Sequence, residues 1–491
     1  MSSDSDVIAP GLVIDGAIEG GGEGTYAVTN PARPSEVVLQ APAASPAQLD
    51  RAVSAARRAV PAWSALDLES RIAVVTAAAR AGVAAVESGD LARLLTREHG
   101  KVYWEAIFDV STMGAMAEGF GPMAAAALAP SSRGASTLEW EPHGVVASIL
   151  PFNWPVAVMA NKVLPALFAG NTTVVKVPPT CPGAALLVAA AMAGALPPGV
   201  LNVVNGPSPE LGAALVGHGD VDMVSFTGGV STGQVVMRAA SSTTRPVVLE
   251  LGGNDAAIVA PDVLVDADLA NRLVEAAFVT SGQVCMAIKR LYVHRDRLDE
   301  MVDALVERLR IEVVGDGLAE GVTMGPVHLA SARDRVEQFI AEAAGAGAKV
   351  HRPGSLRDED RHGGGYFVSP ALVVAPPSGS QIVTEEQFAP ALPVVPYDEL
   401  DAAVAAANDT PFGLCASIWS DDEDVAAAIA PRLQAGTVFV NSHGMAAIDM
   451  HAPMGGWKRS GFGLELGPEG MQALARPRVT ITKPRDTGGG T

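Results

Sequence analysis

The feature that most constrains the fold is a regular alternation of short apolar segments with longer segments rich in Ala and Leu, which begins near residue 144. The short segments are rich in β-branched residues and predict strands at 145–150, 173–177, 201–204, 223–226 and 247–251. The segments between them predict helices near 156–169, 183–195, 209–217 and 231–240. Continuous apolar strands joined by helices predict a parallel sheet that is covered on both faces.

A second alternating series follows and predicts a second α/β block. We expect helices near 268–280, 297–311, 331–346 and 399–407, and strands near 288–293, 367–374, 392–396, 415–419 and 437–441. The chain before both series is helical: a capping box at Ser45 and Gln48 opens a helix that should stop near Pro61, and helical runs cover about 68–98 and 102–118. Two α/β blocks in one chain predict two lobes with a cleft between them.

Length and charge narrow the classes of function. The chain has 491 residues, of which 48% are hydrophobic and 18% charged, a balance typical of a soluble enzyme of two or three domains. Its net charge of −20 argues against nucleic acid or an acidic membrane surface as a partner. The start of the chain does not resemble a signal peptide, and the longest apolar stretch, 184–196, is too short to span a bilayer. We therefore expect a cytoplasmic protein.

The three cysteines, Cys181, Cys285 and Cys415, form no CxxC pair, so we expect neither a disulfide framework nor a bound metal. Cys285 follows a helical run and stands beside glycine and polar residues, where a thiol can face a cleft. A free cysteine more often fills space in a core, and the residues alone leave both interpretations open. Cys181 and Cys415 are expected to be structural.

Two further side chains could act on a reacting group. Glu250 ends an apolar strand ahead of a double glycine, where open α/β sheets place their sites, although a capping or ion-paired carboxylate is an equal alternative. Asn153 lies in the stiff loop PFNWP at 151–155 and could donate to an oxyanion, although a turn-forming Asn is more common.

Two features could contact a phosphate or a ribose. The loop FTGGVSTG at 226–233 follows a strand and opens a helix, so its amides could receive a phosphate, but it is not GxGxxG and the signal is weak. Lys176 ends a strand, where the alternative is an ordinary solvated lysine. The segment 131–142 could be a hairpin that pairs with another subunit or an ordinary surface strand, and the residues favour neither.

Taken in order along the chain, these segments resemble the NAD(P)-dependent aldehyde dehydrogenase superfamily over roughly residues 10–485. The matching stretches are PFNWP at 151–155, FTGGVSTG at 226–233, LELGGN at 249–254, GQVC at 282–285, EEQFAP at 385–390 and PMGGWKRSGFGLELG at 453–467. The ordered series is far more specific than any one motif.

The resemblance implies roles for the catalytic residues in the oxidation of an aldehyde to a carboxylic acid. Cys285 corresponds to the nucleophile, Glu250 to the general base, and Asn153 to the amide that stabilises the oxyanion. Lys162 and Glu465 match a pair behind the active site that is thought to support proton movement. A thiohemiacetal and then a thioester on Cys285 are the implied intermediates.

The resemblance also implies a dinucleotide site. Lys176 falls on the residue that contacts the adenosine ribose, Gly229 on the loop near the pyrophosphate, and Glu386 and Phe388 on the pair that holds the nicotinamide ribose and ring. The implied cofactor-binding set is Phe152, Lys176, Gly228, Gly229, Gly233, Leu251, Glu386 and Phe388.

The chain departs from the family pattern near this site. Lys176 is followed by Val-Pro-Pro without the usual ribose-binding glutamate, so the resemblance implies NAD and leaves NADP open. Gly229, Ser231 and Asn254 differ from the usual residues, and Gln387 replaces an aliphatic residue, a change that we interpret as neutral.

The resemblance further implies the domain organisation and two rival functions. It predicts a Rossmann-like cofactor domain at 10–123 and 143–252, an α/β catalytic domain at 253–456, and a small β oligomerisation arm at 124–142 and 475–485 that gives a homodimer or homotetramer. The rivals are a CoA-acylating semialdehyde dehydrogenase, which typically lacks the base found at Glu250, and a non-catalytic dehydrogenase-like binding protein.

Alignment to the family also places a substrate entrance. The residues expected to line it are Trp154, Ala157, Val158, Asn161, Val284 and Met286, with 443–451 at the mouth. They are mostly apolar with few charges, which favours an uncharged aldehyde over a dicarboxylic semialdehyde without fixing which aldehyde.

Overall fold

The first alternating series forms the parallel centre of an eight-stranded sheet in the computed structural model, which describes residues 10–360 and 363–482. The order is β2-β1-β9-β8-β7-β10-β11-β21, and the parallel strands are β9 (Leu201–Val204), β8 (Thr172–Lys176), β7 (Val145–Ile149), β10 (Met223–Thr227) and β11 (Val247–Glu250). The predicted parallel sheet is confirmed. The antiparallel edges are β1 (Leu12–Ile14), β2 (Ala17–Glu19) and β21 (Gly461–Phe462), so the sheet recruits a segment from near the end of the chain.

The predicted helices of this series are confirmed to within a few residues. They are α5 (Pro155–Phe168), α6 (Gly183–Ala193), α7 (Pro209–Gly217) and α8 (Val230–Ser241). Their apolar sides are buried against the sheet together with the N-terminal helices, in two core clusters that lie on either side of the strands. The carboxyl ends of β7, β8, β10 and β11 therefore meet at one edge.

The N-terminal helices differ in length from the prediction. The capping box of Ser45 and Gln48 is confirmed, but α1 (Pro46–Ser64) runs through Pro61, whose carbonyl still accepts the bond from the Ala65 N–H. The expected run over 68–98 is two helices, α2 (Leu68–Gly89) and α3 (Leu91–His99), because Asp90 takes a left-handed φ of 48° between them. Helix α4 (Tyr103–Ala127) continues past 118 and occupies the start of the segment that was assigned to the arm.

The second series forms a seven-stranded sheet in the order β15-β17-β18-β13-β12-β19-β20, parallel except for β15. Its strands are β15 (Lys349–His351), β17 (Ala371–Val374), β18 (Ala391–Tyr397), β13 (Ile288–His294), β12 (Asp255–Val259), β19 (Cys415–Trp419) and β20 (Thr437–Val440). Its main helices are α9 (Ala267–Phe278), α10 (Leu298–Leu309), α11 (Ala330–Gly345) and α13 (Leu400–Asn408). Strand β12 was not predicted, and β17 begins at 371 rather than 367.

The smaller elements complete the described part of the chain. They are the hairpin β3 (Thr25–Asn30) and β4 (Arg33–Pro42), the pair β14 (Val313–Val314) and β16 (Ser355–Leu356), and the helices α12 (Gln381–Thr384), α14 (Glu423–Ile429) and α15 (Gly467–Ala473). Within residues 10–360 and 363–482, no helix is both long and apolar enough to cross a membrane.

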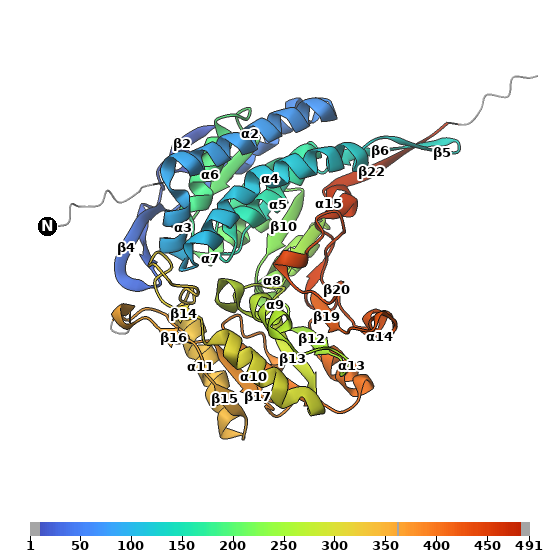
Figure 1. The fold of residues 1–491 in the computed structure, drawn as a ribbon. Coiled ribbons are helices and arrows are strands. Elements are labelled where there is room, and N and C mark those ends of the chain that lie inside the picture. The colour runs from blue at the N-terminus through green and yellow to red at the C-terminus, as the bar shows by residue number, and fades with distance from the viewer. Residues whose placement is uncertain (1–9, 361–362, 483–491) are drawn as a thin grey trace, which may run out of the picture.

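A three-stranded antiparallel arm projects from the body (Figure 1). Strand β6 (Ser136–Pro142) pairs with β5 (Ser131–Arg133) in a hairpin and on its other side with β22 (Ala475–Ile481). The hairpin is therefore real, and it pairs within its own chain with a strand from the C-terminal region. The part of the expected strand at 483–485 lies outside the described residues.

Candidate active site

The loops that follow β7, β8, β10 and β11 bring most of the predicted site residues to one edge of the first sheet. In the strand register, Ile149 stands opposite Lys176, and Thr227 stands opposite Glu250. Asn153 follows β7 in the loop before α5, and Cys285 reaches this region from the loop before β13. Residues far apart in the sequence thus converge on one place.

The loop that carries Cys285 has an unusual backbone. Thr280, Ser281 and Gly282 have φ of 53°, 56° and 73°, three consecutive left-handed residues of which two carry side chains. Such conformations persist only where surrounding contacts hold them. The Ser281 hydroxyl donates to the Gly325 carbonyl at 2.8 Å, and a side chain at Gly282 would meet the Ala389 carbonyl, so this loop is locked in place.

Cys285 is the only one of the three cysteines that is partly exposed as a residue, and all three lie in the described residues. Burial raises the pKa of the Cys285 thiol to about 12; Lys289 opposes the shift, and the carboxylates of Glu250, Asp255 and Glu386 reinforce it. The protein alone therefore keeps this sulfur protonated, and its proton must leave when it attacks. Cys181 and Cys415 are buried, as predicted for structural residues.

Asn153 ties the two catalytic loops together. Its side-chain amide nitrogen donates to the Gln283 carbonyl at 2.9 Å, and the residue is only 7% exposed. One of its two N–H groups is thus fixed while the other is free to donate elsewhere. Among the described residues, none accepts a hydrogen bond from the Cys285 backbone N–H. Two donors are therefore available beside the sulfur, as an oxyanion would require.

Glu250 lies at the end of β11 with its carboxyl group buried, and its Oε1 has no partner among the described residues. Burial raises the pKa of Glu250 well above its usual value; the charge of Glu465 adds to the shift, and Lys162 opposes it. Lys162 Nζ lies 2.6 Å from Glu465 Oε1 and donates to the Ser225 hydroxyl at 3.0 Å. The predicted Lys162–Glu465 pair is therefore formed and interacts electrostatically with Glu250.

Three of the predicted cofactor residues are glycines between β10 and the first turns of α8, namely Gly228, Gly229 and Gly233. Gly228 donates its N–H to the Glu250 carbonyl at 3.0 Å. A side chain at Gly233 would meet Leu251 at 2.5 Å, so glycine allows α8 to pack on that residue. Gly229, the N-cap of α8, has open space where a side chain would point. The amino end of α8 is thus accessible to an anion.

Lys176 ends β8 in a buried position and has no anionic partner in the part of the chain that the structure describes. Within that part, its Nζ makes one hydrogen bond, to the Val177 carbonyl at 3.3 Å. Burial lowers the pKa of Lys176 to about 8. A solvated lysine, the alternative interpretation, does not fit this burial, and an unpaired buried ammonium is costly unless a ligand completes it.

The remaining predicted cofactor residues, Glu386, Phe388 and Phe152, contact the loops that follow β11 and β7. Glu386 Oε1 accepts the N–H of Gly253 at 3.1 Å, and burial raises the pKa of Glu386. Phe388 takes a left-handed φ of 49° and meets Phe152 edge-on, with ring centroids 6.0 Å apart. Phe152 also stacks on His328 at 4.5 Å.

Sequence reasoning missed several residues that hold these loops. Gln387, interpreted as a neutral change, is buried and donates to the Lys289 carbonyl at 3.2 Å, which links the Glu386 loop to the strand after Cys285. No local pattern marks it. Lys101, Glu105 and Asp109 are also buried; the spacing of four places Glu105 and Asp109 on one face of α4, a signal that the sequence did contain, and Lys101 lies just before the helix begins.

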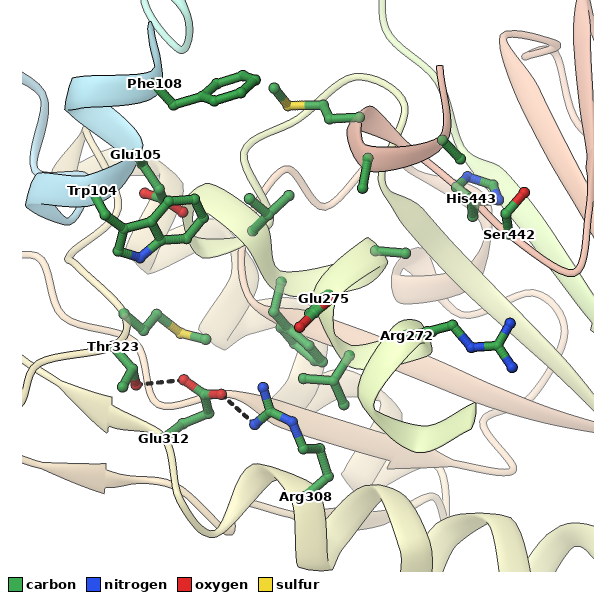
Figure 2. Close-up of a pocket in the computed structure, with 18 of the residues that line it drawn as sticks. Trp104, Glu105, Phe108, Arg272, Glu275, Arg308, Glu312, Thr323, Ser442 and His443 are labelled. Carbon is green, nitrogen blue, oxygen red and sulfur yellow. Dashed lines mark hydrogen bonds and ion pairs between the residues drawn. The ribbon is translucent and has the colours of Figure 1, made fainter. Parts of the chain in front are cut away.

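A cavity of about 610 Å³ opens beside these loops between α4, α9 and the segment 442–447 (Figure 2). Trp104, Phe108, Trp154, Phe278 and Met445 give it largely aromatic and apolar walls. Of the expected entrance residues, Trp154, His443, Met445, Ala446 and Ala447 line this cavity. Ala157, Val158, Asn161, Val284, Met286, Gly444 and residues 448–451 do not, and neither do Cys285, Asn153 and Glu250.

Each charged side chain in the wall of this cavity already has a partner. Arg308 donates to Glu312 at 2.6 Å, and Arg272 pairs with Asp268 at 2.9 Å, outside the cavity (Figure 2). The remaining pairs are Glu275 with Asn271, Glu105 with the N–H of Thr280, and His443 with Ser417. Among the described residues, the cavity therefore offers no unpaired arginine or lysine, whereas Glu275 and Glu105 are bonded only to uncharged groups.

Comparisons with known proteins agree with this geometry. Residues 18–480 match the model of the aldehyde dehydrogenase family. The chain is 37% identical over 452 residues to geranial dehydrogenase of Castellaniella defragrans, covering 90% of this chain and 92% of that one. It is 35% identical over 461 residues to the chloroplastic betaine aldehyde dehydrogenase of Beta vulgaris, covering 91% and 90%.

Solved structures show the same relationship. The chain superimposes with a TM-score of 0.89 and 35% identity on a Cys-to-Ala mutant of aldehyde dehydrogenase C from Pseudomonas syringae in complex with NAD+ and octanal, covering 98% of each chain. Betaine aldehyde dehydrogenase from Staphylococcus aureus, in complex with NAD+, gives a TM-score of 0.88 at 30% identity, covering 97% of this chain and 96% of that one. By sequence and by fold, this chain belongs to the aldehyde dehydrogenase family.

Proposed function

We propose that this chain oxidises an uncharged aldehyde to its carboxylic acid with NAD or NADP, using Cys285 as the nucleophile. The observation that carries the proposal is the convergence of a partly exposed thiol, an anchored amide at Asn153 and an unpartnered buried carboxyl at Glu250. Nucleophile, oxyanion donor and general base are the three groups that a thioester route needs.

The residues at the sheet edge fit a dinucleotide. Lys176 is a buried cation without an anion, and the open amino end of α8 at Gly229 suits a pyrophosphate. Glu386 and Phe388, which contact Gly253 and Phe152, would hold the nicotinamide ribose and ring. When bound, the cofactor supplies the hydride acceptor. Because Lys176 is followed by Val-Pro-Pro, no carboxylate stands directly after it to oppose a 2′-phosphate.

The first half of the mechanism takes place at the sulfur. Cys285, which is partly exposed, gives its proton to solvent, and its sulfur attacks the carbonyl carbon and places negative charge on the carbonyl oxygen. The free N–H of the Asn153 amide and the backbone N–H of Cys285 are the donors for that oxygen. Because the Gln283 carbonyl fixes the amide in advance, no reorganisation is needed as the charge develops.

The second half releases the acid. Glu250, as its carboxylate, takes a proton from the water that attacks the thioester. Because burial favours the neutral carboxyl, Glu250 can also hold the proton it receives, and Lys162 with Glu465 offers a charged pair behind it through which protons can move. The sulfur is then free for another aldehyde.

The walls of the cavity support an uncharged aldehyde. A second carboxylate on the substrate would need a free positive charge, and both arginines in the wall are already paired with carboxylates. Geranial and octanal, named with two similar proteins, are uncharged apolar aldehydes.

The projecting arm supports a homodimer or homotetramer. Two large apolar side chains of β22, Val479 and Ile481, are 56% and 70% exposed, and the outer edges of β5 and β22 are unpaired among the described residues. The assignments of 124–142 and 475–485 to an oligomerisation arm, of 10–123 with 143–252 to a cofactor domain and of 253–456 to a catalytic domain belong to this proposal, as does a cytoplasmic location. Sedimentation of the wild type against Ile481→Glu tests the assembly.

The test of function is a spectrophotometric assay with purified protein. Octanal, geranial, betaine aldehyde and succinic semialdehyde are each supplied with NAD+ or NADP+, and the increase in absorbance of the reduced cofactor is followed with and without CoA. We expect turnover with the two apolar aldehydes and no acyl-CoA. No reduction with any aldehyde would contradict oxidation, and CoA-dependent turnover would favour acylation instead.

A further inference from the structure

Three ionisable side chains that the mechanism does not use are buried at and just before the beginning of α4. Lys101, Glu105 and Asp109 are 1%, 4% and 0% exposed; Glu105 and Asp109 lie one turn apart on α4, and Lys101 lies two residues before the helix begins. Three ionisable groups are expensive to remove from water unless each is engaged. Their partners are the two loops that carry the nucleophile and the oxyanion donor.

Glu105 holds the loop of the nucleophile. Its Oε1 accepts the N–H of Thr280 at 2.6 Å, and its Oε2 accepts the N–H of Val102 at 3.3 Å. Thr280 begins the left-handed stretch that leads to Cys285. The bond from Glu105 is therefore one of the contacts that hold a strained backbone in place, five residues before the sulfur.

Asp109 and Lys101 hold the loop of the oxyanion donor. Asp109 Oδ1 accepts the N–H of Ala157 in the first turn of α5, at 2.8 Å, and its Oδ2 lies 2.9 Å from Lys101 Nζ. The same ammonium lies 3.7 Å from the centre of the Trp154 ring, next to Asn153. Both ends of the segment 154–157 are thus fixed to α4.

The two loops meet at one hydrogen bond, from the Asn153 amide to the Gln283 carbonyl at 2.9 Å. Gln283 is itself tied to Thr280, whose carbonyl accepts the Gln283 N–H at 3.1 Å. A shift at Thr280 would consequently move the group that orients Asn153. We propose that Glu105, Asp109 and Lys101 are positioning residues, which fix the loop of Cys285 and the side-chain amide of Asn153 relative to each other.

This inference rests on the proposed function and is tested by Glu105→Met, which keeps the length of the side chain and removes both acceptor oxygens. The matched control is Glu98→Met, because Glu98 is also fully buried and also accepts two backbone N–H groups, of Gly183 and Ala184 at 2.7 and 2.8 Å, but it caps α6 instead. The two variants should lose similar thermal stability.

Their kinetics should differ. In Glu105→Met we expect kcat to fall roughly a hundredfold, the effect of misplacing reacting groups by about 1 Å, with KM for NAD+ within about twofold of the wild type. Glu98→Met should keep kcat within about threefold. Glu105→Gln retains an oxygen for the Thr280 N–H and should recover most of the lost kcat. An unchanged kcat in Glu105→Met, or an equal loss in both Met variants, overturns the proposal.

A second measurement does not depend on aldehyde oxidation. Iodoacetamide labelling of Cys285 is followed by peptide mass spectrometry without substrate. Releasing the loop should expose the sulfur and speed its labelling in Glu105→Met but not in Glu98→Met. Equal rates overturn the positioning role even if the wild type oxidises aldehydes, and an inactive wild type with the expected labelling difference contradicts only the proposed function.

If Glu105→Met does not fold, Asp109→Asn tests the contacts of Asp109 and Lys101 with the loop that carries Asn153. The amide keeps an oxygen for the Ala157 N–H but leaves the Lys101 ammonium without its counter-charge. We expect kcat to fall more than about fivefold at unchanged KM for NAD+, because Lys101 no longer holds its place over Trp154. Full activity would overturn the proposal.

Discussion

Replacing Glu250 by Gln should separate the two halves of turnover. The carboxyl group lies buried at the end of β11, and its Oε1 has no hydrogen-bond partner among the described residues. Gln has the same shape and, like the protonated carboxyl that burial favours, carries no charge. The variant should therefore fold as stably as the wild type while losing the group that we assign to the activation of water.

The expected fall in kcat in Glu250→Gln follows from the role of Glu250 as a general base. A positioned general base contributes about 10²–10⁴ in rate, which corresponds to roughly 3–5 kcal/mol of barrier. The nearby carboxylate of Glu465 cannot replace it, because both of its oxygens are engaged, by Lys162 at 2.6 Å and by Asn161 at 2.5 Å. Steady-state kcat should fall by about that factor.

Stopped-flow absorbance provides the assay. The attack on the aldehyde and the hydride step do not need Glu250, so mixing Glu250→Gln with aldehyde and NAD+ should give a rapid burst of about one NADH per active site, followed by slow turnover. Cys285→Ala is the control and should give no burst. Loss of the burst together with the slow phase would refute the assignment of Glu250 to the water step.

Three further changes test the rest of the site. Lys162→Met removes the charge that lowers the pKa of Glu250. Activity needs the Glu250 carboxylate and is lost as pH falls through its pKa, so the acidic limb of the pH–kcat profile should move to higher pH. An acidic limb at the wild-type pH would contradict this role of Lys162. Lys176→Met removes a buried, unpaired ammonium and should raise the unfolding temperature while weakening NAD+ about tenfold or more in a fluorescence titration. Gly252→Ala places a methyl group 2.2 Å from Glu386 Oε2 and should raise KM for NAD+ with little change in burst amplitude; normal cofactor affinity would count against Glu386 as a ribose contact.

The strands and the residues at their ends could be predicted because their signals are local. Lys176 and Glu250 each end a run of β-branched residues, and parallel strands bring such ends to one edge. Helix ends were less predictable. Pro61 was expected to stop α1, but a proline removes only one donor, and α1 continues to Ser64.

The contacts between distant segments could not be predicted from the sequence alone. Gln387 was interpreted as neutral because nothing near it marks its bond to the Lys289 carbonyl. The pairing of β21 with β11 depends on where the C-terminal region folds back. The spacing of Glu105 and Asp109 did carry a signal, since two carboxylates on one helix face beside apolar neighbours indicate partners, but a solvated face has the same spacing.

The proposed mechanism requires that the acyl group become covalently bound to the sulfur of Cys285. Glu250→Gln mixed with octanal and NAD+ and quenched in acid during the burst should yield a Cys285 peptide that carries the octanoyl mass, with the peptides of Cys181 and Cys415 unmodified. An acyl group on either of those buried thiols, or a full burst of NADH without any acylated peptide, would contradict it.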